Sequence, residues 1–327
     1  MDALSEVMRL VRLTGAVFFD ARMTAPWAIQ VPPSHVLARA VLPDAEHLIE
    51  YHLVLEGRCY IAVADEAPLE LGRGDLVMVP HGDAHRMSSE PHPTIAPAVV
   101  DAIRMPRPGA IAAPCHGGGG ELTRIACGYL AIDRRLCGAL IDALPRVLRV
   151  DAASSELTAW LQTYLRMRGE HGEDRLGGAC VLAKLSELMF VEAIRRYVEA
   201  LPSGQASWLA GLKDPYVGRA LGLLHREPTR DWTVDALARE TGLSRSALAE
   251  RFTSLIGRSP MQYLTHWRLA LAAHLLKTTT RPASTVAFEV GYESENAFNR
   301  AFKREYGTPP SAWRRQTANA RTEAVAA

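Results

Sequence analysis

The chain has 327 residues, 37 Lys and Arg against 36 Asp and Glu, and a hydrophobic share of 48%. This length exceeds that of one ordinary hydrophobic core and favours two domains. No apolar run is long enough to cross a bilayer, and no basic leader precedes an apolar core, so we expect a cytoplasmic protein with no membrane partner. Its five cysteines are widely spaced without a CxxC pair, which argues against a disulfide framework and a zinc finger.

The N-terminal part is predicted to consist mainly of short strands. After a helix expected at Ala3–Leu13, apolar or alternating runs of strand length follow one another, separated by turns rich in Gly, Pro and Asp. Many short strands with such turns predict a β-sandwich or a β-barrel. The predicted strands are Ala16–Phe19, Val36–Val41, His52–Leu55, Cys59–Val63 and Leu76–Val79.

A motif of the form Gly-x5-Pro-x-Gly-x2-His at residues 74–85 resembles the second motif of the cupin barrel. The first cupin motif is degraded, because Glu50-x-His52-x3-Glu56 lacks one of the two histidines that an enzyme of this type has. One interpretation is a divalent metal held by Glu50, His52 and His85, with Glu56 as a further ligand. The other is a set of polar residues that line a ligand pocket. We expect no cofactor, with the metal site as the open alternative.

Helices are expected again after the barrel. Trp160, Leu161, Tyr164 and Leu165 form one apolar stripe, and a second, longer helix is expected over residues 180–201. The second helix is more apolar than a lone surface helix requires. Two interpretations stay open for it: packing in the core of its own domain, and contact with a second copy of the chain in a homodimer. A linker rich in Pro, Gly and Ser follows.

The C-terminal part contains a repeat with an offset of 50 residues. In each copy a glycine ends one helix and a serine caps the next. These features predict two helix-turn-helix units joined by one long helix, an arrangement suited to reading two neighbouring segments of one DNA duplex. Phe252-x4-Gly257-x2-Pro260-x2-Tyr263 recurs as Phe302-x4-Gly307-x2-Pro310-x2-Trp313, with Gly242 and Ser244 before the first and Gly291 and Ser294 before the second.

The stretch VAFEVGYESENAFNRAFKREYGTPPSAWRR resembles the signature of AraC/XylS-type transcription regulators, and the resemblance extends from about Asp214 to Arg315. It implies that the second helix of each unit, Ser244–Ile256 and Ser294–Glu305, enters the major groove of double-stranded DNA. It also implies activation of transcription, with RNA polymerase as a partner. Arg245, Arg251 and Arg300 are the first candidates for base or phosphate contacts, and Asn296 and Asn299 for adenine. The whole expected set is Ser244, Arg245, Ser246, Ala249, Glu250, Arg251, Ser294, Asn296, Asn299, Arg300, Lys303 and Arg304.

The distribution of charge agrees with DNA binding by the C-terminal part. Residues 213–315 hold 16 Lys and Arg and 10 Asp and Glu, a net charge of +6. Residues 1–212 hold 20 basic and 25 acidic residues, a net charge of −5. A chain that is nearly neutral as a whole therefore has a basic C-terminal part, as contact with phosphates requires.

Two cysteines are candidate sensors. The segment order LEGRCYI, LGRGDLVMVPHGDAH and RIACGYL resembles the cupin-type sensor domain of one AraC subgroup, in which Cys59 and Cys127 occupy characteristic places. The resemblance implies redox or metal sensing by these thiols. The alternative is that both are small hydrophobic residues of the core.

The sequence therefore predicts an α+β protein, with an N-terminal cupin-like β-barrel that carries accessory helices and a C-terminal all-α domain of two helix-turn-helix units. The predicted segments are a sensor domain at 1–150, a helical dimerisation region at 151–201, a linker at 202–212, a DNA-binding domain at 213–315 and a disordered tail at 316–327. The expected function is a sequence-specific transcription regulator, an activator, that a small-molecule effector, a metal or a redox signal controls.

The rival hypothesis is a metal-dependent cupin enzyme, such as a dioxygenase or an isomerase, with an appended helical domain. It rests on His52, Glu56 and His85. The missing histidine weakens it, because catalytic metals of this class need three or four side-chain ligands. We therefore expect no enzyme.

Overall fold

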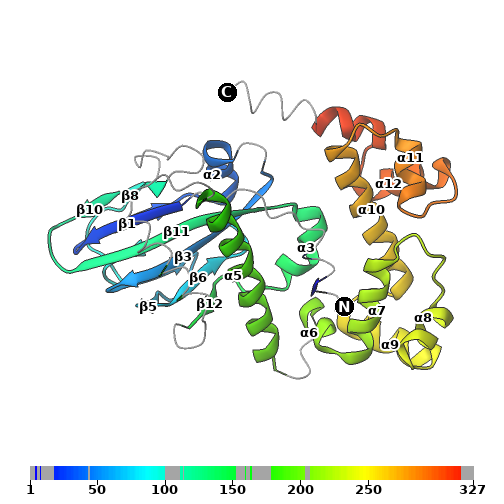
Figure 1. The fold of residues 1–327 in the computed structure, drawn as a ribbon, viewed down its shortest axis with the longest axis horizontal. Helices are drawn as coiled ribbons and strands as arrows, with labels where there is room; N and C mark the ends of the chain where they lie inside the picture. The colour runs from blue at the N-terminus through cyan, green and yellow to red at the C-terminus, as the bar shows by residue number, and fades with distance from the viewer. Residues whose placement is uncertain are drawn as a thin grey trace. The chain divides into compact units, whose positions relative to one another are not determined.

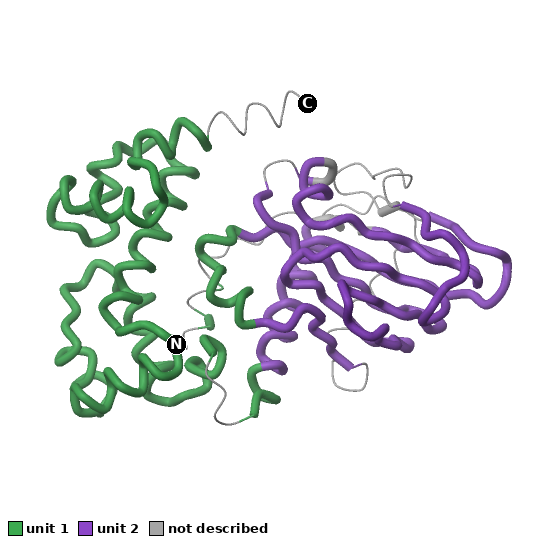
Figure 2. Tube along the Cα trace, turned by 180° about the vertical axis from the view of Figure 1, so that it is seen from behind, with its two compact units in different colours: residues 1–12, 133–143, 198–327 green, residues 13–132, 144–197 purple. Residues whose placement is uncertain are grey.

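The computed structural model describes residues 18–42, 45–99, 111–112, 114–151, 178–202 and 207–317, together with residues 4, 5, 8, 159 and 163. The chain divides into two compact units (Figure 2). Unit 1 comprises Met1–Arg12, Asp133–Ala143 and Val198–Ala327, and unit 2 comprises Leu13–Ile132 and Leu144–Tyr197.

Unit 2 is built on two β-sheets (Figure 1). The strand order in the larger sheet is β10-β1-β11-β3-β6-β12, and β9 also pairs with β1. The order in the smaller sheet is β5-β4-β7-β2-β8. The larger sheet contains β1 (Phe18–Thr24), β3 (His47–Glu56), β6 (Leu76–Val79), β9 (Ile111–Ala112), β10 (Cys115–Gly117), β11 (Leu122–Ile132) and β12 (Leu148–Val150). The smaller contains β2 (Ala28–Val31), β4 (Arg58–Val63), β5 (Leu69–Gly72), β7 (His85–Ser88) and β8 (Ala98–Val99).

One hydrophobic core takes side chains from both sheets. Phe19 of β1, Val54 of β3 and Val77 of β6 join Ile61 of β4 and Met87 of β7 in a single buried cluster. Alternate residues of each strand point inward, as the period-two pattern of a strand requires. The predicted barrel or sandwich is therefore confirmed, and the predicted strands at His52–Leu55, Cys59–Val63 and Leu76–Val79 lie in β3, β4 and β6.

The prediction of a strand at Val36–Val41 was wrong. These residues belong to the helix α2 (Ser34–Val41). Leu37 and Ala38 are buried while Val36 is exposed, so the burial follows a helical face rather than an alternating one. A short apolar run does not by itself distinguish a helix from a strand, which explains the error.

The helix α5 (Gly178–Ala200) matches the long apolar helix expected after the barrel. Its buried residues include Leu182, Ser186 and Phe190. The Ser186 hydroxyl lies 2.9 Å from the hydroxyl of Tyr51 on β3, so a buried polar contact joins this helix to the larger sheet. Gly128 of β11 stands opposite Tyr51, and a Cβ atom there would come within 2.2 Å of the Tyr51 hydroxyl oxygen.

Three other expectations fall on residues outside the described ones. They are most of the helix at Ala3–Leu13, the stripe from Trp160 to Leu165, and most of the tail at 316–327. The structure adds a helix that the sequence reasoning did not predict, α3 (Arg134–Asp142), which Asp133 caps by accepting a hydrogen bond from the Arg135 amide. In the part of the chain that the structure describes, no helix has the length and apolar character to cross a membrane.

Unit 1 is helical. Trp208 and Leu209 of α6 are buried, and the Trp208 indole donates to the Tyr263 hydroxyl at 3.0 Å, so α6 packs inside this unit although it lies in the segment expected to be a linker. Besides α3, its helices are α6 (Trp208–Lys213), α7 (Pro215–Arg226), α8 (Val234–Thr241), α9 (Arg245–Ile256), α10 (Pro260–Thr278), α11 (Ala283–Glu289) and α12 (Glu295–Tyr306).

Candidate DNA interface and candidate effector cavity

Two helix-turn-helix units, α8–α9 and α11–α12, repeat the same local chemistry. Gly242 follows α8 at φ +80° and Gly291 occupies the matching turn at φ +89°, both in the left-handed region that favours glycine. Ser244 then accepts from the Ala247 amide at 3.3 Å, and Ser294 accepts from the Ala297 amide at 3.2 Å. Each serine thereby caps a helix, as the sequence predicted.

The sequence repeat is also a packing repeat. Phe252 and Phe302 are both fully buried. Tyr263 meets Phe252 edge to face at 5.8 Å and 73°, and Trp313 meets Phe302 edge to face at 5.9 Å and 79°. The same aromatic pair therefore anchors the second helix of each unit.

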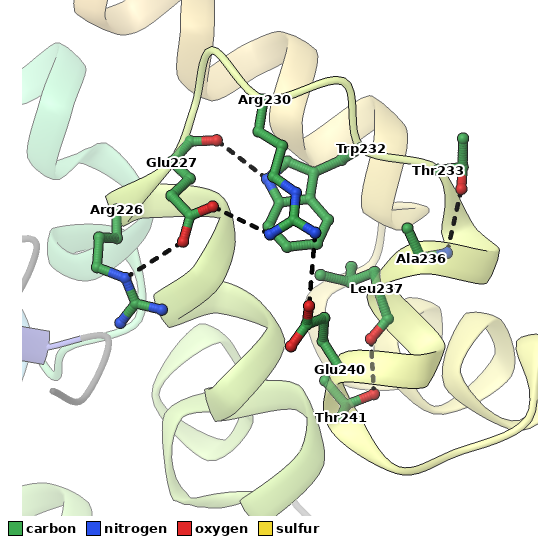
Figure 3. Close-up of polar contacts among 9 residues, drawn as sticks. All are labelled: Arg226, Glu227, Arg230, Trp232, Thr233, Ala236, Leu237, Glu240 and Thr241. Atoms are coloured by element: carbon green, nitrogen blue, oxygen red, sulfur yellow. Dashed lines mark hydrogen bonds and ion pairs between the residues drawn. The ribbon is translucent and has the colours of Figure 1, made fainter.

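The loop between α7 and α8 is held by a cluster of side chains (Figure 3). Arg230 lies over the ring of Trp232 at 4.0 Å and donates to Glu227 at 3.1 Å and to Glu240 at 3.4 Å. The Trp232 indole donates to the Glu227 carbonyl oxygen at 3.0 Å. These contacts fix the loop against α8, the first helix of the first helix-turn-helix unit.

Arg268 of α10 attaches the same loop to the second helix-turn-helix unit. Its guanidinium donates to the carbonyl oxygens of Pro228 at 2.6 Å and Arg230 at 3.0 Å. A Cβ atom at Gly291 would come within 2.9 Å of the Thr229 Cα and within 3.0 Å of the Arg268 guanidinium carbon. The turn of the second unit therefore rests directly on the loop of the first.

The predicted DNA-facing residues are mostly on the outside of α9 and α12. Ala249 and Asn299 are half-buried, and the others are exposed. The repeat aligns Glu250, Thr253 and Ser254 of α9 with Arg300, Lys303 and Arg304 of α12. The outer face of α12 is therefore basic where that of α9 is acidic or neutral.

The arginines of α9 are already engaged within the chain. Arg251 donates to the Asp214 carboxylate at 2.6 Å, and Asp214 also caps α7 by accepting from the amides of Tyr216 and Val217. Although burial acts to raise the pKa of Asp214, the hydrogen bond from Arg251 and those from the two amides hold it below its ordinary value. Arg245 forms a looser, exposed ion pair with Asp235 at 3.3 Å.

The cations of α12, unlike the arginines of α9, are not engaged in ion pairs in the part of the chain that the structure describes. Among the described residues, Arg300, Lys303 and Arg304 form no ion pair within the chain. Long exposed cations without a partner are suited to phosphates and guanine edges. Among the described residues, α12 therefore presents exposed cations without an ion pair, whereas both arginines of α9 are paired.

In unit 2 the predicted polar residues form a chain across the two sheets. The Nε2 atoms of His52 on β3 and His85 on β7 lie 2.8 Å apart. The Nδ1 atom of His52 lies 2.9 Å from the Cys127 sulfur, and the Nδ1 atom of His85 lies 3.2 Å from a Glu50 oxygen. Glu56 lies outside this group, at the exposed end of β3.

The direction of the hydrogen bonds in this chain follows from one carbonyl group. The Asp83 carbonyl oxygen accepts a hydrogen bond from His85 Nδ1 at 3.1 Å. Because a neutral imidazole carries one proton, the Nε2 atom of His85 then has none, and it accepts a hydrogen bond from His52 Nε2. His52 Nδ1 is then also an acceptor, and the Cys127 thiol donates to it.

Burial favours the uncharged form of each member of this chain. It lowers the pKa of His52 well below the ordinary value, with a further contribution from His85, and lowers that of His85 to about 4, against the opposing effect of Asp83. Burial also raises the pKa of the Cys127 thiol, with smaller contributions from Cys59 and Asp20. Burial and the charge of Asp83 raise the pKa of Glu50.

The geometry does not converge on a point where a metal could sit. His52 contacts Nε2 of His85, whereas Glu50 contacts the opposite ring nitrogen, Nδ1. Among the described residues, no group of three or more His, Cys, Asp or Glu is arranged to hold a metal ion. The three candidate ligands are together in space, but they contact one another in a row rather than as a coordination sphere.

The two candidate sensor cysteines have different surroundings. Cys59 is fully buried, and burial, with the charge of Asp75, raises its pKa to about 12. Cys127 is partly exposed and lines a cavity of about 50 Å³. The sequence reasoning did not find this cavity, because its wall comes from five strands and two loops that only the fold brings together. Its lining is Phe19, Ala21, Met23, Trp27, Ile29, Val31, His52, Met87, Pro114, Ile125, Cys127 and Tyr129.

Comparison with known proteins agrees with this architecture. The family model described as Cupin matches residues 2–199, and the model described as Helix-turn-helix domain matches residues 237–316. These matches and the two helix-turn-helix units define a DNA-binding regulator with a cupin-like N-terminal part. The chain belongs to the AraC family of transcription regulators.

Three relatives illustrate the likeness. A protein of Streptomyces lividans whose name describes it as AraC-like is 30% identical over 318 residues, which cover 96% of this chain and 98% of that protein. The HTH-type transcriptional regulator AlkR of Acinetobacter baylyi is 29% identical, with coverage of 97% and 100%. The crystal structure of the DNA-binding domain of AdpA with a target DNA is 31% identical over 32% of this chain and 92% of that one, with a TM-score of 0.30. The rival hypothesis of a cupin enzyme finds no support among these proteins.

Proposed function

We propose that this AraC-family regulator is an effector-controlled activator that acts in the cytoplasm. In this proposal the cavity of unit 2 receives a small effector, and α9 and α12 enter two successive segments of the major groove. The observation that supports it most directly is the repeated packing of α9 and α12, which presents two capped helices in the same way. RNA polymerase is the expected partner of an activator.

The two contact helices have different surfaces, so we propose that they read different sequences. Arg300, Lys303 and Arg304 supply positive charge on α12, whereas α9 offers Ser246, Glu250 and neighbouring neutral side chains. A binding site composed of two unlike halves follows, and it would fix the orientation of the protein on the promoter.

We further propose a homodimer in which α5 takes part. One face of α5 packs into unit 2, and Val181 and Leu188 stay exposed on another face. Exposed apolar residues on a long helix are an ordinary basis for association. An effector then acts by binding more tightly to one arrangement of the protein than to another.

The test is a selection of bound fragments from random DNA with the full-length protein at a stated salt concentration. We expect one motif with two unlike halves about one helical turn, ~10 base pairs, apart. A motif with two identical halves would contradict the proposed difference between α9 and α12. Recovery of only one half would contradict the use of both helices.

A further inference from the structure

The cavity of unit 2 restricts the size of what can enter. It has room of about 50 Å³. One water needs roughly 10–15 Å³ of such space, so the cavity holds a molecule of about four non-hydrogen atoms. Most of the wall is apolar, including Phe19, Ile29 and Met87. A small, weakly polar molecule fits this wall better than a sugar or an ion.

One wall residue carries an unsatisfied donor. Trp27 is fully buried and lines the cavity, and its indole N–H has no hydrogen-bond partner among the residues that the structure describes. A buried indole N–H is nearly always hydrogen-bonded, since leaving it unpaired costs about 1–3 kcal/mol. A ligand that carries one acceptor oxygen would satisfy it.

A second wall residue carries a nucleophile. The Cys127 thiol lines the cavity, is partly exposed, and donates to His52 at 2.9 Å. Burial keeps the resting thiol protonated, so the addition requires the thiol proton to pass to His52 as the sulfur attacks. An imidazole that is itself oriented by a further group is placed to accept that proton. Here His85 orients His52, and the Asp83 carbonyl orients His85.

We propose that the effector is a small α,β-unsaturated aldehyde or ketone, and that Cys127 adds to it covalently. The sulfur forms a bond to the β-carbon, and the π electrons of the carbon–carbon double bond move toward the α-carbon, which takes up the thiol proton by way of His52. The Trp27 N–H binds the carbonyl oxygen, where negative charge collects during the addition. No atom leaves and no external oxidant or reductant takes part.

This inference rests on the proposed function of unit 2 as the effector-binding part. It differs from redox sensing by Cys59 and Cys127, because an oxidant has no use for the Trp27 donor and leaves no carbon adduct. It also gives the two thiols different roles, since Cys59 does not line the cavity.

The experiment treats the full-length protein with acrolein, which has a carbonyl oxygen and three carbons, or with the bulkier N-phenylmaleimide. Peptide mass spectrometry then follows the adduct at each cysteine. Cys115 is exposed and serves as the internal reference, and buried Cys59 is the negative control. The measured quantity is the rate of labelling at Cys127 divided by the rate at Cys115. We expect this ratio to be at least about tenfold higher for acrolein than for N-phenylmaleimide, because only acrolein fits the cavity.

A variant tests the donor. Trp27→Phe keeps an aromatic ring and removes the N–H, so we expect acrolein addition at Cys127 to slow by roughly tenfold, the effect of one lost hydrogen bond in a transition state. The rate at Cys115 should not change. The smaller ring widens the cavity, which on its own would speed the reaction, so a fall is informative. An unchanged rate in Trp27→Phe overturns the inference, as does acrolein labelling of Cys115 without Cys127 in the wild-type protein.

The affinity of the protein for its selected DNA site, measured with and without the adduct, tests the covalent inference separately from the proposed function. An adduct at Cys127 that changes the affinity for the selected site supports both. An adduct that leaves the affinity unchanged supports the reactive cavity and contradicts its role as the effector site. Effector control that persists in Cys127→Ser supports the proposed function and overturns the covalent inference.

Discussion

Arg251 and Arg300 show how one residue type takes different roles in the two copies of a repeat. Arg251 is committed to the Asp214 carboxylate, which caps α7. Arg300 is exposed on α12 and has no ion pair within the described residues. The sequence pattern predicts both arginines as DNA contacts, because it does not show that Arg251 has an acidic partner within the chain. Asp214 lies 37 residues before Arg251, so only the fold brings the pair together.

We therefore expect Arg300→Ala to weaken specific DNA binding by about 1–3 kcal/mol and to lower the slope of log affinity against log salt by about 1. Arg251→Ala is the matched control. Because its partner is Asp214 rather than DNA, it should leave the affinity within about threefold, the size of a surface ion pair. Fluorescence anisotropy over a range of salt concentrations measures both. A larger loss in Arg251→Ala than in Arg300→Ala would reverse the assignment.

The polar residues of the barrel were predicted only in part. The period of a strand placed Glu50 and His52 on one face, and the cupin-like motif placed His85 near them, as the structure shows. The sequence could not tell whether these residues converge on a metal or form a row, since that depends on which ring nitrogen each partner meets. Trp27 was not singled out, because an unpaired indole N–H is a property of the packed structure.

At the scale of elements, the tandem helices were predictable because each carries its own stop and start signals. Gly242 and Gly291 adopt the left-handed turn, and Ser244 and Ser294 cap the helices that follow. The prediction of a strand at Val36–Val41 was wrong, because only the pattern of buried side chains in the structure distinguishes a short apolar helix from a strand. The contact between α5 and β3 could not be predicted from the sequence, because Tyr51 and Ser186 are 135 residues apart along the chain.

That contact is a coupling point between the barrel and α5. Tyr51 sits on β3 between Glu50 and His52, so one strand carries both the polar row and the anchor of the helix. We expect Tyr51→Phe to lower the free energy of unfolding by about 1–2 kcal/mol, because it removes a buried hydrogen bond and adds no cavity. Tyr60→Phe, on the partly exposed strand β4, is the control. Urea unfolding measures the difference, and equal values for the two variants would contradict the role of this contact.

At the scale of the whole molecule, the chain combines an acidic part of net charge −5, residues 1–212, with a basic part of net charge +6, residues 213–315. The overall charge of +1 conceals this division. The helix α5 belongs to both units, since its last three residues cluster with unit 1.

We expect the homodimer to depend on the exposed apolar residues of α5, Val181 and Leu188. Leu188 is 52% exposed, and Leu188→Lys should shift the protein toward monomer, because a lysine in an apolar contact loses its hydration. Val36→Lys, at an exposed position of α2 with 41% exposure, is the matched control. Sedimentation velocity reports the result. If Leu188→Lys stays dimeric, α5 is not the interface.

The attachment of Gly291 and Arg268 to the loop at 228–230 has a consequence for the DNA itself. The two contact helices are held on α10, a single helix of 19 residues, which spans about 28 Å. One turn of straight B-form DNA spans roughly 34 Å. Because the turn of the second unit rests on the loop of the first, the protein has little freedom to stretch. The duplex is the softer partner. We therefore expect a promoter that both helices contact to curve toward the protein, so that the ease with which a sequence curves becomes part of what is recognised.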